Sequence, residues 1–231
     1  MKKLVIIPAY NEAKNIVSTI QDIIRNVSDF DYVIINDRST DDTYEVCRKN
    51  KFNIINLSLN LGIGGAVQTG YMYAYENGYD IAVQFDGDGQ HDAKYLNEMA
   101  EYMQKSQCNM VIGSRFIEKE GFQSSSTRRM GIKFFSLLIK IFTRKRITDP
   151  TSGFRMCDKL VIRLFAENYP KDYPEPETTV RVLCSKMKVE EIPVMMRERQ
   201  GGVSSISLKK SVYYMIKVTL AVIIERIRKH R

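Results

Sequence analysis

Short runs of aliphatic residues alternate with longer segments of helical period through the first half of the chain. The short runs predict strands at residues 3–7, 32–36, 53–57, 81–85 and 110–112. The longer segments predict helices at residues 13–26, 41–50, 64–77 and 93–105. Strands and helices that alternate through short connections make right-handed crossovers, which place successive strands parallel in one sheet. The pattern therefore predicts an α/β fold with a mainly parallel central sheet flanked by helices.

The second half of the chain is less regular. It predicts helices at residues 128–144, 160–167 and 177–186, a strand at 189–195 and a last helix from about residue 208. Residues 149–155, with the sequence DPTSGFR, are expected to form a loop. Because no linker or internal repeat divides the chain, we expect one domain at residues 1–206, followed by a C-terminal amphipathic helix at 207–231.

Polar residues cluster where predicted strands end. Residues 8–12 follow the first strand, Asp37 follows the second, and residues 86–92 follow the fourth. In a parallel sheet these carboxyl ends lie along one edge, which is where such folds bind ligands. We therefore expect the three segments to form one site.

Asp86 and Asp88 flank a glycine at the end of the fourth predicted strand. Carboxylates two residues apart on an extended chain point to the same side, and their oxygens are ligands that Mg²⁺ and Mn²⁺ prefer. A metal held there would neutralise the charge that develops on a departing diphosphate. The alternative is an acidic turn without a ligand, because Asp-Gly pairs are common in turns. A calcium loop is excluded, since the distal glutamate of that pattern is absent.

The net charge of +8 comes from two segments. Residues 121–148 contain seven Lys or Arg and no acid, and residues 203–231 contain seven Lys or Arg and one acid. Nucleic-acid binding is one function of a basic chain. These segments, however, interleave their charges with apolar side chains such as Phe134, Phe135 and Leu137. The mixture favours an anionic membrane surface over nucleic acid as the partner.

Membrane contact is expected without a spanning helix. The longest apolar stretch, residues 212–224, has thirteen residues and includes Lys217, whereas a spanning helix needs about 20. The alternative for this last helix is burial against the domain or a second subunit. The first residues predict a strand rather than an export signal, because Pro8 ends their apolar run. Four widely separated cysteines without a CxxC pair favour reduced thiols in a cytosolic compartment.

Six motifs occur in the order typical of the family-2 glycosyltransferases, which the chain resembles from about residue 3 to residue 205. They are VIIPAYNE at 5–12, NDRSTD at 36–41, NLGIGGA at 60–66, DGD at 86–88, GSRF at 113–116 and DPTSGFR at 149–155. The last motif is similar to that of the polyprenyl-phosphate branch, which includes dolichol-phosphate mannose synthase.

The resemblance implies a GT-A nucleotide-sugar-binding fold and inverting transfer of a sugar, from a nucleotide-sugar that is by analogy UDP-linked, to a polyprenyl phosphate. It also implies a divalent metal, Mg²⁺ or Mn²⁺, held with the diphosphate by Asp86, Asp88 and Gln90. The nucleotide-sugar-binding positions that it implies are Pro8, Ala9, Tyr10, Glu12, Asp37, Gly64, Asp86 and Arg199. The acceptor-phosphate positions are Arg115, Arg128, Arg129 and Arg155. Gly202 and Ser204 resemble a basic loop over the phosphates, but Ser205 and Ile63 stand where relatives often carry lysine.

The candidate catalytic residues are Asp149, Arg115 and Arg155. A phosphate acceptor is already anionic near neutral pH, so Asp149 would orient it or act as a base while arginines position the phosphates. Arg155 can also pair with Asp149 structurally, and this pairing is compatible with a role toward phosphate.

Other candidate residues have alternatives too. Asn11 and Glu12 can simply begin a helix, with Asn11 as its N-cap, and Asp37 can belong to a capped turn. His91 is expected beside the ligands rather than among them.

The function expected is a metal-dependent hexosyl- or N-acetylhexosaminyltransferase, peripheral at the inner, cytoplasmic face of the membrane. A small integral-membrane partner or a second copy of the chain are further partners by analogy. One alternative is transfer to a saccharide hydroxyl in cell-surface polysaccharide synthesis, which requires a firmer base than Asp149. The other is an inactive nucleotide-sugar-binding scaffold, against which the intact Asp86 and Asp88 argue.

Overall fold

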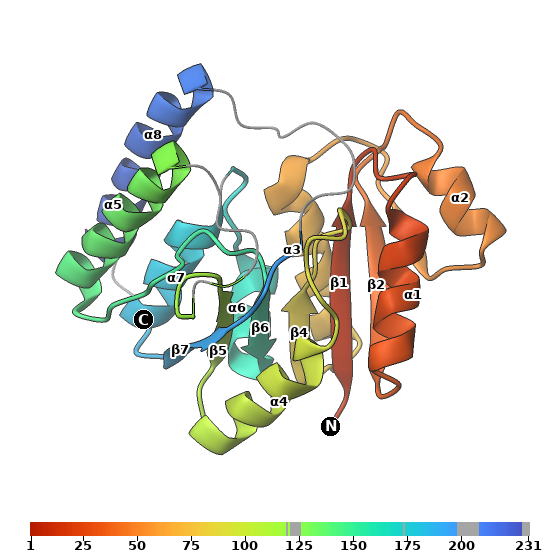
Figure 1. Ribbon diagram of the computed structural model, residues 1–231, viewed down its shortest axis with the longest axis horizontal. Coiled ribbons are helices and arrows are strands. Elements are labelled where there is room, and N and C mark those ends of the chain that lie inside the picture. The colour runs from red at the N-terminus through yellow and green to blue at the C-terminus, as the bar shows by residue number, and fades with distance from the viewer. Residues whose placement is uncertain (119, 121–125, 173, 198–207, 228–231) are drawn as a thin grey trace.

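One seven-stranded sheet organises the part of the chain that the computed structural model describes, residues 1–118, 120, 126–172, 174–197 and 208–227 (Figure 1). Its strands are β1 (Lys3–Ala9), β2 (Phe30–Asn36), β3 (Ile54–Asn56), β4 (Ile81–Gln84), β5 (Met110–Ser114), β6 (Arg155–Asp158) and β7 (Val189–Pro193). The helices are α1 (Ile16–Asn26), α2 (Thr43–Lys49), α3 (Gly62–Glu76), α4 (Tyr95–Ser106), α5 (Ser126–Thr143), α6 (Lys159–Glu167), α7 (Pro174–Cys184) and α8 (Leu208–Ile227). The strand order is β3-β2-β1-β4-β6-β5-β7.

The sheet is parallel except where β6 enters it. β1 pairs in parallel with β2 and β4, β2 pairs with β3, and β5 pairs with β7. β6 lies antiparallel between β4 and β5. The expected α/β fold with a mainly parallel sheet is therefore confirmed.

Strand β6 was not predicted from the sequence. The loop expected at residues 149–155 ends one residue earlier, because Arg155 is the first residue of β6. The strand has only four residues, Arg-Met-Cys-Asp, of which two are apolar. So short a run carries no measurable period, and its neighbours in the sheet are distant in sequence. A second difference is the start of α7, which begins at Pro174 rather than at residue 177. Proline fits the first turn of a helix, because its missing N–H would have no partner there.

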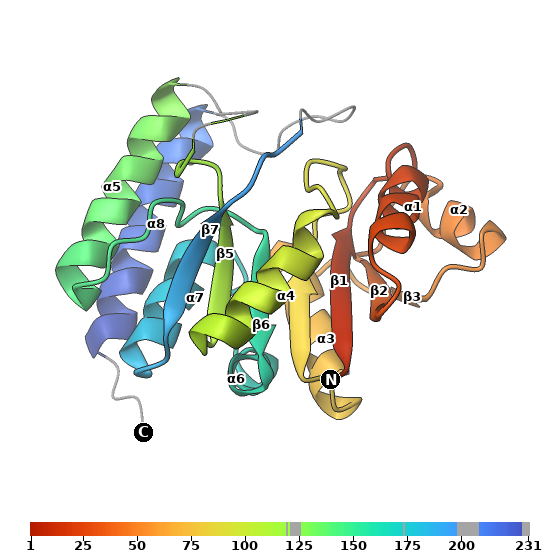
Figure 2. The ribbon, with the colours of Figure 1, turned by 60° about the horizontal axis from the view of Figure 1, so that its bottom comes forward.

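Alternate residues of β1 enter two separate cores. Leu4 and Ile6 face one core and Val5 and Ile7 face the other, and all four are 0% exposed. Side chains of α3, α5, α6, α7 and α8 fill the first core, and those of α1, α2 and α4 fill the second (Figures 1 and 2). A strand buried on both faces requires a continuous apolar run, which explains the sequence LVII.

The C-terminal helix α8 packs one face against the domain. Val218 and Val222 are 2% and 0% exposed within the first core. The Arg181 guanidinium of α7 donates from Nε to Glu225 Oε1 at 2.7 Å, and both side chains are buried. Figures 1 and 2 show α8 lying beside α5. Of the two alternatives for this helix, burial against the domain therefore holds for one face. None of the helices in the described ranges has the length and apolar content to span a membrane.

Candidate active site

Asp37, which follows β2, is bonded to the end of β1 and to the start of α3. Its backbone N–H donates to Ala9 O at 2.9 Å, and its Oδ1 accepts from the Leu61 N–H at 2.6 Å. The residue is 3% exposed. In the turn that follows, Asp41 Oδ1 accepts from the Thr43 N–H at 3.0 Å, at the start of α2. The Asp37 carboxylate bonds outside this turn and ties the start of α3 to the end of β2.

The turn after β1 is ordered by Asn11. Its φ of 58° lies in the left-handed region, and its Oδ1 accepts from the Thr40 N–H at 2.8 Å. Because α1 begins only at Ile16, Asn11 is not the N-cap of that helix, and this alternative was wrong. Glu12 is 7% exposed, and its Oε2 accepts from Asn15 Nδ2 at 2.8 Å. Tyr10, at 48% exposed, lies open to solvent beside this turn.

Residues 86–92, called the 86–92 loop below, follow β4. Asp86 donates its backbone N–H to His91 Nδ1 at 3.0 Å, and its Oδ1 accepts from Gln84 Nε2 at 3.1 Å. His91 is 3% exposed, and its Nε2 lies 3.7 Å from Asp86 Oδ2. Asp88 Oδ1 accepts from the Gln90 N–H at 3.1 Å. The Asp86 side chain nevertheless stays 36% exposed, so it can still reach a ligand.

Aromatic packing and a glycine fix the surroundings of Asp86. The His91 ring stacks on Phe154, with centroids 4.7 Å apart and planes 14° from parallel. A Cβ at Gly153 would lie 2.9 Å from Gln84 Nε2 and 3.1 Å from Asp86 Oδ2. A larger residue at position 153 would therefore have to displace the Gln84 amide and crowd the Asp86 carboxylate. Gln84 Oε1 is buried without a hydrogen-bond partner among the described residues.

The Asp86 and Asp88 carboxylates suit a metal ion that arrives with phosphates. The described residues contain no cluster of three or more His, Cys, Asp or Glu side chains that could hold a metal alone. Mg²⁺ is commonly held by one or two carboxylates together with substrate phosphates. The donor set at the end of β4 fits this second arrangement.

Gly64 packs against protein backbone. A Cβ there would lie 2.0 Å from Pro170 O, and the Gly64 N–H donates to Lys171 O at 3.1 Å. The glycine is thus required for contact between α3 and the segment after α6, whatever its role toward a nucleotide.

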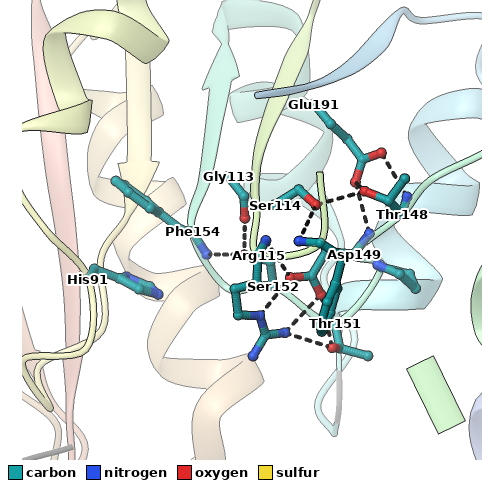
Figure 3. A network of polar contacts seen from close by, with 12 residues as sticks. His91, Gly113, Ser114, Arg115, Thr148, Asp149, Thr151, Ser152, Phe154 and Glu191 are labelled. Atoms are coloured by element: carbon teal, nitrogen blue, oxygen red, sulfur yellow. Dashed lines mark hydrogen bonds and ion pairs between the residues drawn. The ribbon is translucent and has the colours of Figure 1, made fainter. Parts of the chain in front are cut away.

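A buried polar network lies at the ends of β5 and β7 (Figure 3). Arg115 donates from Nε and Nη2 to the two carboxylate oxygens of Asp149, at 2.6 and 2.8 Å. Asp149 is 0% exposed and also accepts from Arg115 N and Thr151 Oγ1. The partner of Asp149 is therefore Arg115, and the expected alternative of an Arg155–Asp149 pair was wrong.

Glu191 of β7 supports this network from behind. It accepts from Thr148 N at 2.7 Å and from Asp149 N at 2.9 Å. Burial raises the pKa of its carboxyl from the ordinary value of 4.5, while these backbone bonds act in the opposite direction. Sequence reasoning missed Glu191, because an acid in the run Val-Glu-Glu-Ile-Pro reads as the solvent side of an edge strand.

Arg155 is 1% exposed and donates to protein oxygens. Its bonds run to Ser152 O, Glu175 O, Thr178 Oγ1 and Pro150 O, at 2.6 to 2.9 Å. A guanidinium has about five N–H donors, so these four bonds leave little capacity for a phosphate.

Several expected site residues are placed only in part. Arg129 is exposed near the start of α5. The side chain of Arg128 lies outside the described residues, as do Arg199, Gly202, Ser204 and Ser205.

The sequence and the fold both match a known class of enzyme. The family model for glycosyl transferase family 2 matches residues 4–166, and the chain belongs to this family. It is a glycosyltransferase with the GT-A fold. The glucosyl-3-phosphoglycerate synthase of Mycobacterium tuberculosis, solved with Mn²⁺, UDP and phosphoglyceric acid, superposes with a TM-score of 0.75 at 14% identity, over 99% of this chain and 80% of that one. Staphylococcus aureus TarS 1–349 with UDP-GlcNAc superposes with a TM-score of 0.67 at 16% identity, over 97% and 67%.

Curated relatives agree with the resemblance to the polyprenyl-phosphate branch. The UDP-N-acetylglucosamine–dolichyl-phosphate N-acetylglucosaminyltransferase of Methanococcus voltae is 29% identical, over 82% of this chain and 83% of that protein. The undecaprenyl-phosphate mannosyltransferase of Micrococcus luteus is 27% identical, over 90% and 88%.

Proposed function

We propose that this glycosyltransferase moves a sugar from a UDP-linked donor to a polyprenyl phosphate, with inversion and with a divalent metal. The observation that carries the choice of acceptor is the state of Asp149. This carboxylate is fully buried and bonded to Arg115, so it is poorly placed to take a proton from a sugar hydroxyl. A phosphate acceptor needs no strong base, because it is already anionic near neutral pH. Relatives whose names include dolichyl phosphate and undecaprenyl phosphate support the same acceptor class.

The donor is assigned to the ends of β1, β2 and β4. Asp86 and Asp88 would hold Mg²⁺ or Mn²⁺ together with the diphosphate, and Gln90 stands next to them in the 86–92 loop. Such a metal neutralises charge on the departing nucleotide diphosphate. Asp37 and the exposed Tyr10 are proposed to contact the base and the ribose of the nucleotide. The Mn²⁺ and UDP of the solved neighbours support this assignment.

The acceptor phosphate is assigned to Arg115 and Arg129. The Asp149 carboxylate fixes the plane of the Arg115 guanidinium, so its charge is held in one orientation before the substrate arrives. Arg129 adds a positive charge near the start of α5. Arg155, with four donors on protein oxygens, is proposed to shape the 149–155 segment rather than to contact the phosphate.

We also propose that α5 and α8 together contact an anionic membrane from the cytoplasmic side. Each helix exposes an apolar stripe at spacings of three and four residues: Met130, Phe134, Leu137 and Ile141 on α5, and Ile216, Leu220, Ile224 and Ile227 on α8. Exposed Lys133 and Lys140 flank the α5 stripe. An apolar stripe beside lysines is the pattern of a helix that lies in the membrane interface.

The test is a transfer assay with purified protein, Mn²⁺, a panel of labelled nucleotide-sugars and a short-chain polyprenyl phosphate. We expect product with at least one UDP-sugar on the lipid phosphate, and none on the free polyprenol. Transfer to saccharide acceptors alone would overturn the choice of acceptor. Donor binding without turnover on any acceptor would favour the alternative of an inactive nucleotide-sugar-binding scaffold.

A further inference from the structure

The 86–92 loop needs support from outside, because two of its residues are glycines. Gly89 has a φ of 77°, a conformation that other residues rarely adopt, and glycine loses much conformational freedom when it is fixed. The bonds from Asp86 to His91 and from Gln90 to Asp88 are local to the loop. Thr19 Oγ1 of α1 donates to Gly87 O at 3.3 Å and Phe154 stacks on His91, but neither contact reaches Asp88, Gly89 or Gln90.

A segment more than a hundred residues later in the chain supplies that support. Residues 194–197 continue from the end of β7 toward the loop, with the Val194 N–H on Ser114 O at 3.0 Å and the Met195 N–H on Tyr95 Oη at 3.0 Å. Met196 is buried in the second core at 7% exposed. These contacts deliver Arg197 to the 86–92 loop along a fixed path.

Arg197 then bonds the loop in two ways. Its backbone N–H donates to Gln90 O at 2.9 Å, and Gln90 Nε2 reaches back to Arg197 O at 3.5 Å. Its guanidinium lies between two carboxylates, 3.0 Å from Asp92 Oδ1 and 3.0 Å from Asp22 Oδ2 of α1. Asp22 also accepts from the Ala93 N–H at 3.2 Å, directly after the loop.

The chain of bonds continues to a candidate metal ligand. Arg197 holds the peptide of Gln90 by its carbonyl, and the N–H of the same residue donates to Asp88 Oδ1 at 3.1 Å. Without the guanidinium, Asp22 and Asp92 would lose the cation that they share, and Asp92 would keep the more distant Lys94 ammonium at 3.5 Å. The position of the Asp88 carboxylate therefore depends on the 194–197 segment, because the Arg197 backbone holds Gln90 and the Arg197 guanidinium anchors the segment and Asp92 to α1. Arg197 is not itself in the DGD motif.

We propose that Arg197 is a positioning residue, which clamps the 86–92 loop to α1 and thereby orients Asp88 for the metal and the donor diphosphate. This inference rests on the proposed function for the role of the metal. Residues that orient metal ligands typically change metal affinity by about 10–100-fold when they are replaced. Exposed ion pairs contribute little to global stability, and the Arg197 side chain is 43% exposed. The clamp should therefore act on the site and hardly on the fold.

The test compares Arg197→Ala, Arg197→Lys and a control, Arg163→Ala, which removes an exposed i,i+4 ion pair with Glu167 on α6. Hydrogen–deuterium exchange is measured for each metal-free protein, and the Mn²⁺ dissociation constant is measured by calorimetry in the presence of saturating UDP. For Arg197→Ala we expect faster exchange confined to peptides covering residues 86–93 and 194–197. We also expect Mn²⁺ to bind about tenfold more weakly, the donor KM to rise more than kcat falls, and the melting temperature to stay within a few degrees. Arg197→Lys should recover part of the affinity, and the control should match wild type.

Two results would overturn the clamp: unchanged exchange of residues 86–93 in Arg197→Ala, or faster exchange with unchanged Mn²⁺ affinity. Failure of the proposed function gives a different result. Wild-type protein that binds no Mn²⁺ even in the presence of UDP would remove the metal assignment, while the exchange data would still decide whether Arg197 holds the loop.

Discussion

The two halves of the molecule use charged residues in different ways. At the ends of β2 and β4, the Asp37 carboxylate accepts a hydrogen bond from the start of α3, and the Asp86 side chain remains 36% exposed. In the half that contains β5, β6 and β7, Asp149 and Arg155 are 0% and 1% exposed. Their bonds run to protein groups on every side. Both halves carry motifs of the same family, so a motif identifies the residue type but not whether its charge faces a substrate or another side chain.

The largest effect that this comparison predicts is at the ends of β1, β2 and β4, the part of the molecule proposed to bind the donor and called the donor half below. Asp88→Asn should reduce turnover by more than the roughly 10–100-fold typical of residues that only orient a metal ligand. The substitution removes a charge at the end of β4 but is nearly isosteric, so the fold should persist. Turnover at saturating Mn²⁺ and the far-ultraviolet circular dichroism spectrum measure the two effects. Activity near that of wild type would remove Asp88 from the site.

In the other half, the matching substitution should act on stability first. Arg155→Ala leaves the buried carbonyls of Ser152 and Pro150 without this donor, at a cost of about 1–3 kcal/mol for each unsatisfied group, whereas Glu175 O keeps the hydroxyls of Thr178 and Thr179. We expect the free energy of unfolding to fall by at least about 2 kcal/mol, with donor and acceptor binding weakened together. Denaturant titration and both binding constants check this.

Arg129→Ala is the matched control for Arg155, because Arg129 is exposed. It should raise the acceptor KM while leaving the midpoint of denaturation unchanged. A stable Arg155→Ala protein with normal donor affinity and weak acceptor binding would contradict the structural role. It would restore the sequence-based assignment of Arg155 to the acceptor phosphate.

Sequence reasoning succeeded where local pattern decides the structure. Strands β1 to β5 and helices α1 to α4 follow from runs such as Leu-Val-Ile-Ile, and the carboxyl ends of parallel strands bring Asp37 and Asp86 to one edge. It failed where pairing is between distant segments. The sequence of residues 155–158 has no pattern that predicts a strand, and its place between β4 and β5 is set by pairing with those distant strands. The partners of Arg115 and Glu191, likewise, are set by the meeting of β5, β7 and the 149–155 segment.

A smaller effect is expected at the exposed faces of α5 and α8, which belong to the second half but present apolar groups outward. Truncation of α8 would remove Val222 and Glu225 from the interior, so substitution is the cleaner test. Ile141→Glu and Leu220→Glu should each weaken binding to anionic vesicles several-fold at low salt. The vesicle binding of the wild type should itself fall as salt rises, because each basic residue near the surface contributes about 1 kcal/mol.

Ile24→Glu on α1 is the control for this test, since Ile24 is 55% exposed on the opposite face of the sheet. It should bind vesicles as wild type does. Equal binding by all three variants would remove the α5–α8 face from the membrane. Attachment to the membrane would then depend on a partner protein.

The smallest predicted effect concerns the pH dependence of Glu191, the buried acid behind Asp149. Burial raises the pKa of Glu191 above its ordinary value of 4.5, so the folded protein holds this proton more tightly than the unfolded chain does. Its contribution to folding is therefore greatest below pH 4.5 and decreases as pH rises through the higher pKa of the folded state.

In Glu191→Gln the group no longer titrates, and all other carboxylates are shared with wild type. The difference in unfolding free energy, wild type minus variant, should thus grow as pH is lowered from 7 to 4.5, whatever its absolute size. Denaturant titrations of both proteins across this range measure it. A difference that shrinks toward low pH would mean that the bonds from Thr148 and Asp149 outweigh burial. Glu191 would then act as a stabilising charge.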